Sequence, residues 1–348
     1  MNEKKLPIGQ TPIRCYQYIG IPLSIMTSEK QSWAWVHSNF IQLHAADNLK
    51  VHVNLPILFT SGNIFLDMDY CPWLYRERIG FDVFVRFEIG VVPFLIDSLD
   101  KDIYVCLIVD EFYLPHTVHY LQTEFFHEML VTGYDYDRKC FHTLGYNKQG
   151  QFAPAEVTFA SMQQAFQEVA HKPGKQLWQS SVCRFRIERT RGYEFDLEFV
   201  IDSLKDYVAS DNRCSSKRMY SNPVGTKYGM AVYDKIVEHL SLMQQGELRM
   251  DIRPLHLIWE HKKCMTARLR YMSEEIGIEG LEPMREPCDK IEKLAFSARN
   301  EMMRGWMKGD KSGIPSILKT IEELRLQERP IVEQLIEKLE ASDAVRLV

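Results

Sequence analysis

The sequence predicts an α+β protein in which a mixed domain with a central antiparallel sheet is followed by a helical C-terminal region. Between about residues 80 and 190, short apolar runs alternate with polar turns, a pattern typical of strands. After residue 192, apolar residues recur with helical spacing. Since 45% of the 348 residues are hydrophobic, the chain can bury a large core. We therefore expect two domains, residues 1–192 and 193–348.

The strands of the mixed domain are expected from their side-chain patterns. Residues 81–89 alternate apolar and polar side chains, as a half-buried strand does, whereas residues 103–109 are almost continuously apolar and predict a central strand. Residues 128–134 and 140–146 are rich in β-formers and flank a polar turn. They predict a hairpin. Short helices are expected at residues 93–99 and 161–170.

A strand with a cationic face is expected at residues 182–191. Its arginines alternate with apolar residues, and they are Arg184, Arg186, Arg189 and Arg191. One interpretation is a solvated edge strand. The other is a docking face for an acidic carrier protein or a phosphopantetheine arm, since Arg pairs well with phosphate.

The C-terminal region is expected to be helical, with one exposed loop at residues 213–222 that is positioned to cover a cleft. Pro330 should bend the last helical pair, because proline removes a backbone donor. The expected helices cover residues 197–208, 232–240, 255–276, 315–326 and 331–339.

Composition excludes several classes of protein. The formal charge of -5 provides no general attraction to nucleic acid or to an anionic membrane, so neither partner is expected. No apolar stretch approaches the roughly 20 residues of a membrane span, and the N-terminus lacks a signal-peptide pattern, so we expect a cytoplasmic protein. The eight cysteines form no C-x-x-C pair, which indicates neither a zinc site nor a disulfide framework.

Two neighbouring stretches predict cysteine chemistry. The apolar strand at 103–109 is followed by Asp110, and His127 opens a strand that stops at a Gly-Tyr-Asp turn. A cysteine nucleophile needs a histidine to ionise it and a third group to orient that histidine. Cys15 is the candidate nucleophile, with Cys71 as its rival and a buried structural thiol as the alternative. A helix beginning near Cys15 would favour its thiolate, although Pro22 should interrupt that helix early.

The remaining candidates have both functional and structural interpretations. Asn147 is the candidate orienting residue for His127. Asp110, Tyr113 and His116 are placed to contact substrate in a cleft, or Asp110 caps the following loop. Trp33 and Trp35 line an acyl pocket or belong to the core. His256 and Glu260 share a helix face, which suits a hydrogen-bonded pair as readily as a metal site, and no metal is expected.

The chain resembles the N-terminal domain family named after butirosin biosynthesis protein H. The resemblance covers residues 10–210 and lies in Val-Asp-Glu-Phe-Tyr-Leu-Pro at 109–115, His127 with Gly-Tyr-Asp at 133–135, and residues 193–208. It implies a papain-like fold related to bacteriocin-processing cysteine peptidases. In that arrangement the cysteine lies near the N-terminus, the histidine begins a strand and an Asp or Asn follows on the next strand. Here Gly-Tyr-Asn at 145–147 stands at the expected aspartate.

The resemblance also implies a function. The family's named member transfers an acyl group from a carrier-protein thioester to an amine of an aminoglycoside, and relatives accompany nonribosomal peptide assembly lines. We therefore expect an acyltransferase of antibiotic or related specialised metabolism, whose partners are an acyl or peptidyl carrier protein and a small-molecule amine or peptide. No cofactor beyond the carrier's phosphopantetheine is expected. The alternatives are an inactive relative that binds a carrier domain or peptide, and a leader-peptide cysteine peptidase.

Overall fold

The chain divides into two compact units. The computed structural model describes residues 2–45, 57–60, 73–172, 181–190, 192–213 and 226–342. The sheet unit comprises Met1–Ser32 and Met68–Gly192, and the helical unit comprises Trp33–Asp67 and Tyr193–Val348. The sequence predicted the same boundary after residue 192, but it assigned residues 33–67 to the first domain. In the structure this segment clusters with the second.

The sheet unit is built on an antiparallel sheet with strand order β4-β9-β5-β6-β7-β8, and β1 also pairs with β6. All seven residues of the central strand β5 are buried, as its apolar sequence predicts. The predicted hairpin is confirmed, because β6 and β7 pair from Asp135 and Cys140 inward. The strands are β1 (Glu3–Lys5), β4 (Leu74–Gly80), β5 (Tyr104–Asp110), β6 (Phe126–Asp135), β7 (Cys140–Tyr146), β8 (Phe152–Thr158) and β9 (Ser181–Ile187).

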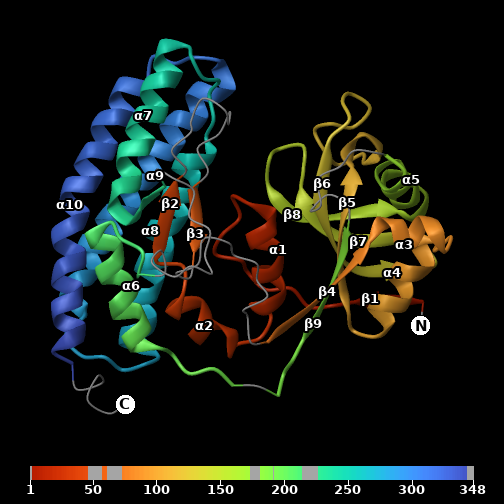
Figure 1. The fold of residues 1–348 in the computed structure, drawn as a ribbon, viewed down its shortest axis with the longest axis horizontal. Coiled ribbons are helices and arrows are strands. Elements are labelled where there is room, and N and C mark those ends of the chain that lie inside the picture. Colours follow the sequence, from red (N-terminus) through yellow and green to blue (C-terminus); the bar gives the residue numbers. More distant parts are fainter. Residues whose placement is uncertain are drawn as a thin grey trace. The chain divides into compact units, whose positions relative to one another are not determined.

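Helices cover both faces of this sheet (Figure 1). On one face lie α3 (Phe81–Arg86), α4 (Val91–Asp100) and α5 (Phe159–Ala170), and on the other lies α1 (Gln17–Met26). The expected helices at 93–99 and 161–170 are thereby confirmed as α4 and α5. The ring of Phe166 on α5 packs edge-on against Phe81 and Phe84 at 5.2 Å each. These aromatic contacts join α3 and α5 over the sheet.

Two predictions for the sheet unit are wrong. Within the expected strand at 81–89, residues 81–86 form helix α3 instead, because Phe81 and Phe84, three positions apart, are both buried on one helix side. Strand β9 is internal, between β4 and β5, and not a solvated edge. Its Arg184 is neutralised by Glu77 on β4 at 2.9 Å.

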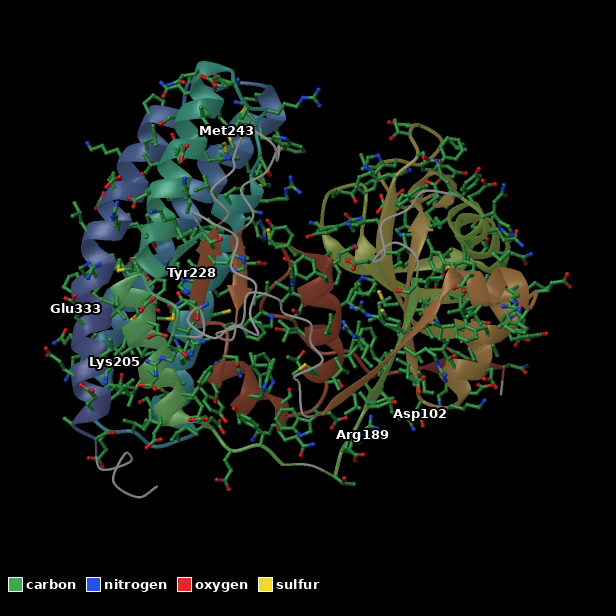
Figure 2. The ribbon with its side chains drawn as sticks, viewed as in Figure 1. Asp102, Arg189, Lys205, Tyr228, Met243 and Glu333 are labelled. Atoms are coloured by element: carbon green, nitrogen blue, oxygen red, sulfur yellow. The ribbon has the colours of Figure 1, made fainter. Side chains whose placement is uncertain are left out.

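Other charges of the sheet unit lie at its surface. Arg189 pairs with Glu29 at 2.8 Å, and Asp102 pairs with Lys4 at 2.8 Å; Figure 2 labels Arg189 and Asp102. Both labelled side chains are more than half exposed. Such pairs contribute little to stability. Arg191 lies outside the described residues.

The helical unit contains long helices and a small sheet of order β10-β2-β3 (Figure 1). Helix α8 packs on α9, and α10 packs on α9, α6 and α7. Of the predicted loop at 213–222, only Arg213 lies within the described residues. The elements are α2 (Ser32–Ser38), β2 (Gln42–Ala45), β3 (Ile57–Thr60), α6 (Leu197–Ala209), β10 (Lys227–Tyr228), α7 (Val232–Gln245), α8 (Arg253–Glu274), α9 (Arg285–Lys308) and α10 (Ile314–Glu340).

Helix α10 continues through Pro330, where the sequence predicted two helices. Proline has no backbone N–H, so the carbonyl of Leu326, four residues earlier, has no donor within the helix. The Leu326 side chain is 74% exposed, so this carbonyl lies on a side of the helix that water can reach. Beyond the proline, Val332, Leu335 and Leu339 keep the helical spacing and are buried. Packing therefore holds the helix together across Pro330. None of the described helices is long and apolar enough to cross a membrane.

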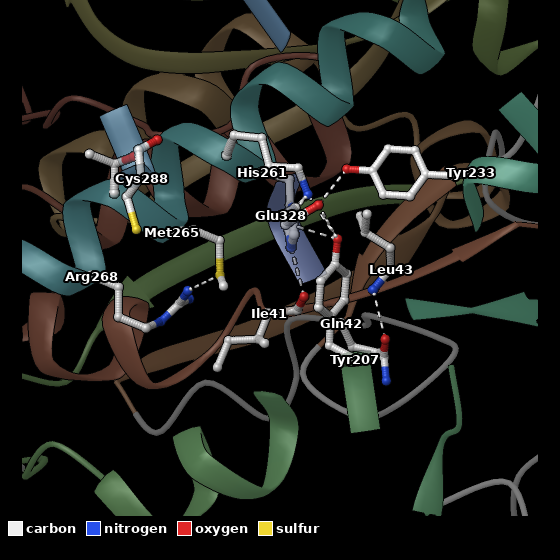
Figure 3. A network of polar contacts seen from close by, with 12 residues as sticks. Ile41, Gln42, Leu43, Tyr207, Tyr233, His261, Met265, Arg268, Cys288 and Glu328 are labelled. Carbon is white, nitrogen blue, oxygen red and sulfur yellow. Dashed lines mark hydrogen bonds and ion pairs between the residues drawn. The ribbon is translucent and has the colours of Figure 1, made fainter. Parts of the chain in front are cut away.

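A buried polar network lies in the helical unit, and Figure 3 shows Glu328, Tyr207 and Tyr233 of this network. Lys262 Nζ on α8 is 2.6 Å from Glu328 Oε1 on α10, and both side chains are at most 3% exposed. Tyr233 on α7 donates to Glu328 Oε2 at 2.6 Å, and Lys262 donates to the Tyr207 hydroxyl on α6 at 2.8 Å. Burial lowers the pKa of Lys262, and the charge of Glu328 opposes that shift. One network thus joins four helices.

Segment 33–45 is attached to the helical unit by another buried cation. Arg268 on α8 is 1% exposed and donates to the backbone carbonyls of His37 at 2.6 Å, Phe40 at 3.2 Å and Asn39. His261 Nε2 donates to the carbonyl of Ile41 at 2.7 Å. A buried guanidinium requires such acceptors. These bonds explain why a segment near the N-terminus belongs to the second unit.

Breaking the buried ion pair should destabilise the helical unit strongly. We expect Lys262→Met to cost about 3–5 kcal/mol, because Glu328 would be left buried without its cation. The double variant Lys262→Met, Glu328→Leu should cost less, since no uncompensated charge remains. Hydrogen exchange of α8 and α10 amides measures both. Lys205→Met, in the exposed pair with Glu340, is the control and should change stability by less than about 1 kcal/mol. A single variant as stable as this control would contradict the prediction.

The helical unit should also lose stability in acid through His44. Burial lowers the pKa of His44 on β2 from 6.5 to about 4. The unfolded chain therefore takes up a proton before the folded one does, so the stability present above pH 6.5 decreases as the pH falls toward about 4. The loss should reach about 3 kcal/mol. Urea unfolding at a series of pH values should show that the free energy of unfolding falls less with acid in His44→Gln than in the wild type. His171→Gln, at an exposed histidine, should leave this pH dependence unchanged.

Candidate active site around His127

The imidazole of His127 is held by a carboxylate at the end of the neighbouring strand. His127 Nδ1 lies 2.7 Å from Glu111 Oε1, and the Glu111 side chain is 6% exposed. Strands β5 and β6 pair antiparallel with Val109 opposite His127, so the turn after β5 returns Glu111 to the histidine. Nδ1 is the donor in this bond, because a carboxylate accepts. The orienting group thus precedes His127 in the chain.

Asp110 builds the turn that positions Glu111. It is 3% exposed, and its Oδ1 accepts from the backbone N–H groups of Phe112 at 3.1 Å and Phe125 at 3.0 Å. The N–H of Glu111 donates to the carbonyl of Phe125 at 2.9 Å. The structure therefore gives Asp110 the loop-capping role, one of its two predicted interpretations. Tyr113 ends this turn, with its ring 5.0 Å from that of Phe112.

Gln17 on α1 contacts the other nitrogen of the imidazole. With its amide oriented so that donors face acceptors, its nitrogen donates to His127 Nε2 at 3.1 Å and to the Glu128 carbonyl at 2.6 Å. Its oxygen accepts from the backbone N–H of Tyr146 at 3.2 Å. Gln17 thus bridges β6 and β7 and fixes the imidazole from the side opposite Glu111.

Tyr146 links the Cys15 segment to His127. Its hydroxyl donates to the carbonyl of Cys15 at 3.1 Å and to that of Arg14, while its ring stacks on the His127 ring at 5.8 Å with planes 9° apart. Cys15 is buried and directly precedes Tyr16, the residue before α1. Tyr146 therefore contacts both the backbone of Cys15 and the imidazole of His127, which Glu111 holds from the other side.

Helix α1 is longer than the sequence predicts. It runs from Gln17 to Met26 through Pro22, where an early break was expected. Nine of its ten residues are buried, so packing holds the helix despite the missing donor of Pro22. The N-terminal end of α1, where the helix dipole is positive, lies two residues after Cys15.

Asn147 does not orient the imidazole. Its side-chain oxygen accepts from the backbone N–H groups of Gln149 and Gln151, both at 3.0 Å, and thereby shapes the turn between β7 and β8. Both ring nitrogens of His127 have other partners. Glu111 therefore replaces Asn147 as the orienting residue. The neighbouring sequence indicated a carboxylate cluster at 110–111, but gave no sign that the chain returns it to His127.

His116 remains a candidate for substrate contact. Its two ring nitrogens are buried and have no hydrogen-bond partner among the described residues. Burial lowers its pKa, while the charge of Glu111 raises it and that of Lys148 lowers it. The ring therefore lies within electrostatic reach of Glu111, the partner of His127.

Three other predicted residues belong to the helical unit or fall outside the described residues. Trp33 and Trp35 belong to the helical unit, where Trp33 stacks on His37 at 5.5 Å and the buried Trp35 meets Phe40 edge-on at 5.6 Å. These contacts fit the core interpretation. The rival nucleophile Cys71 lies outside the described residues.

His256 and Glu260 form the hydrogen-bonded pair that their spacing allowed. His256 Nε2 is 3.2 Å from Glu260 Oε1, and Arg299 donates to its Nδ1 at 3.2 Å. Both ring nitrogens are thus engaged. Among the described residues, no group of three or more His, Cys, Asp or Glu side chains is arranged to hold a metal ion.

Comparison of the sequence with protein-family models and with curated proteins finds no match in either. The chemistry of the site therefore has to be inferred from its own residues.

The turn at Asp110 should be essential for placing Glu111. Asp110→Ala leaves the backbone N–H groups of Phe112 and Phe125 without their acceptor, and we expect a loss of about 1–3 kcal/mol in the sheet unit. Hydrogen exchange at the N-terminal end of β6 measures this loss. Asp97→Ala, which removes an exposed ion pair with Lys101, should have almost no effect. Equal effects of the two variants would contradict the assigned role.

Proposed function

We propose that this protein is a cysteine-dependent acyltransferase with a papain-like catalytic arrangement. Cys15 takes an acyl or aminoacyl group from a carrier-protein thioester, and an amine accepts it. The observation that supports this most directly is the Glu111–His127 hydrogen bond of 2.7 Å beside the segment containing Cys15. An imidazole held by a carboxylate next to a thiol is the arrangement that activates a cysteine nucleophile.

Each residue of the cluster has a role in this reaction. His127 takes the proton of the Cys15 thiol, and the thiolate attacks the thioester carbonyl carbon. The bond to the pantetheine sulfur breaks, and that sulfur receives the proton from His127. Glu111 keeps the imidazole oriented and stabilises its charged form.

The resemblance to the family of butirosin biosynthesis protein H supports the substrate class. It favours a phosphopantetheine-bound acyl or peptidyl donor of specialised metabolism and an amine acceptor. The phosphopantetheine belongs to the carrier protein, so this chain needs no cofactor of its own. The cationic residues Arg184 and Arg186 of β9 are already close to Glu77 and are weak candidates for carrier docking.

One observation favours a second function, binding of a carrier domain or peptide without turnover. The Nε2 atom of His127, which would receive the thiol proton, already accepts a hydrogen bond from Gln17. Catalysis requires the Cys15 thiol to replace the Gln17 amide as the hydrogen-bond donor to this nitrogen. A protein that only binds would have no such requirement.

The two functions differ in whether Cys15 becomes acylated. Incubation with butyryl-N-acetylcysteamine, which mimics the pantetheine end of the donor, should add one butyryl group measurable by intact mass. Cys15→Ala should abolish the adduct, and His127→Ala should slow its formation by about 100-fold or more. Cys140→Ala, a buried free cysteine of the same sheet, is the matched control and should react like the wild type.

An adduct undiminished in Cys15→Ala would exclude that nucleophile. Carrier-protein binding by a wild-type chain that forms no adduct would favour the non-catalytic function.

A further inference from the structure

The helical unit has an open cavity of about 400 Å³ along α8. Its lining residues come from α8 with its C-terminal end, from α2 and from α9, which all belong to one compact unit. Pockets that bind small molecules have volumes of roughly 300 to 1,000 Å³. The cavity is therefore large enough for a small molecule, and its side chains indicate which kind.

His37 on α2 lines this cavity with an imidazole that lacks a hydrogen-bond partner. It is 8% exposed, and its ring stacks on those of Trp33 at 5.5 Å and Tyr271 at 4.5 Å. No hydrogen bond joins its ring nitrogens to any residue that the structure describes. Burial and the charge of Arg268 lower the pKa of His37 to about 3, so at neutral pH the ring offers one donor and one acceptor. Buried polar groups normally have partners, and a ligand in the cavity would supply one.

Two side chains of opposite charge line the same cavity without forming an ion pair. Lys263 on α8 is exposed and Glu292 on α9 is partly exposed, and neither is paired with a residue in the described ranges. Arg270 and Glu274, which also line the cavity, differ in this respect, because each has an ion-pair partner at 2.9 and 2.8 Å. The cavity thus presents one unpaired cation, one unpaired anion and one neutral imidazole.

A free α-amino acid carries the groups that complement these three side chains. Its carboxylate can pair with Lys263 and its ammonium group with Glu292, in charge-assisted hydrogen bonds. The His37 ring can donate to the carboxylate or accept from the ammonium group. A purely anionic ligand would be attracted by Lys263 but repelled by Glu292, and a purely cationic ligand would meet the reverse. A zwitterion has favourable interactions with both.

We propose that this cavity binds a free α-amino acid, with Lys263 at its carboxylate, Glu292 at its ammonium group and His37 between them. The stacked rings of Trp33 and Tyr271 hold the imidazole in place before the ligand arrives, which reduces the entropic cost of binding. The inference goes beyond the proposed acyl transfer, because all of its residues belong to the helical unit.

Titration of the full-length chain with L-leucine tests the proposal, followed by the NMR signals of the His37 ring and of the α8 backbone amides. Three analogues of the probe remove its charges in turn. N-Acetyl-L-leucine lacks the ammonium group, L-leucinamide lacks the carboxylate, and N-acetyl-L-leucinamide lacks both. We expect each singly charged analogue to bind about tenfold more weakly than L-leucine or worse, because one charge-assisted bond is lost. The doubly modified analogue should cause no saturable shift.

Two variants assign each ligand charge to its residue. Lys263→Met should weaken L-leucine binding about tenfold or more and should bind L-leucine and L-leucinamide equally, because the carboxylate has lost its partner. Glu292→Gln should weaken L-leucine binding to a similar extent and should bind L-leucine and N-acetyl-L-leucine equally. Lys293→Met and Glu322→Gln, the same changes at exposed positions outside the cavity lining, are the controls and should bind like the wild type.

Three results would overturn the site. They are the absence of saturable shifts with L-leucine, equal binding of L-leucine and N-acetyl-L-leucinamide, and wild-type affinity in both Lys263→Met and Glu292→Gln. None of these measurements depends on acylation of Cys15. A chain that forms no acyl adduct but selects the zwitterion through Lys263 and Glu292 would overturn acyl transfer and leave the amino-acid site standing.

Discussion

The antiparallel pairing of β5 with β6 is the constraint on which the site depends. It places Val109 opposite His127, so the residues that follow β5 lie beside the residues that begin β6. Asp110 then binds the N–H group of Phe125 and closes the turn, and Glu111 reaches the imidazole. A shift of one residue in this register would send the His127 side chain to the opposite face of the sheet. The sheet therefore fixes the orientation of the imidazole before any substrate binds.

The two units are each stabilised by their own buried polar groups. In the helical unit, Lys262 and Glu328 join helices far apart in the sequence, and Arg268 holds the backbone of segment 33–45. In the sheet unit, Gln17 bridges β6 and β7 from α1. Such groups are costly to bury unless each donor and acceptor is satisfied. They specify which segments pack together more strictly than apolar contacts do.

Local patterns predicted the elements whose environment is simple. The continuous apolar run of β5 and the polar turn between β6 and β7 are strong signals, and both were correct. The strand predicted for residues 81–89 was wrong because the alternating pattern also fits a helix with Phe81 and Phe84 buried on one side. The placement of segment 33–45 was unpredictable, since it depends on backbone carbonyls that accept from Arg268, more than 200 residues later in the chain.

The candidate site was predictable in its histidine but not in that histidine's partners. His127 stood out because it begins an apolar strand that ends in Gly-Tyr-Asp. Chain order suggested Asn147 as its partner, whereas folding supplies Glu111 from the strand before. Gln17 belongs to no motif, and only the position of α1 reveals its contact with the imidazole.

The most direct test of the account is the rate at which iodoacetamide alkylates Cys15 at neutral pH, located by peptide mass spectrometry. Activation by His127 predicts that Cys15 reacts faster than Cys140 or Cys264, and that His127→Ala slows Cys15 about tenfold or more without affecting the others. Equal alkylation of Cys15 in the wild type and in His127→Ala would contradict it.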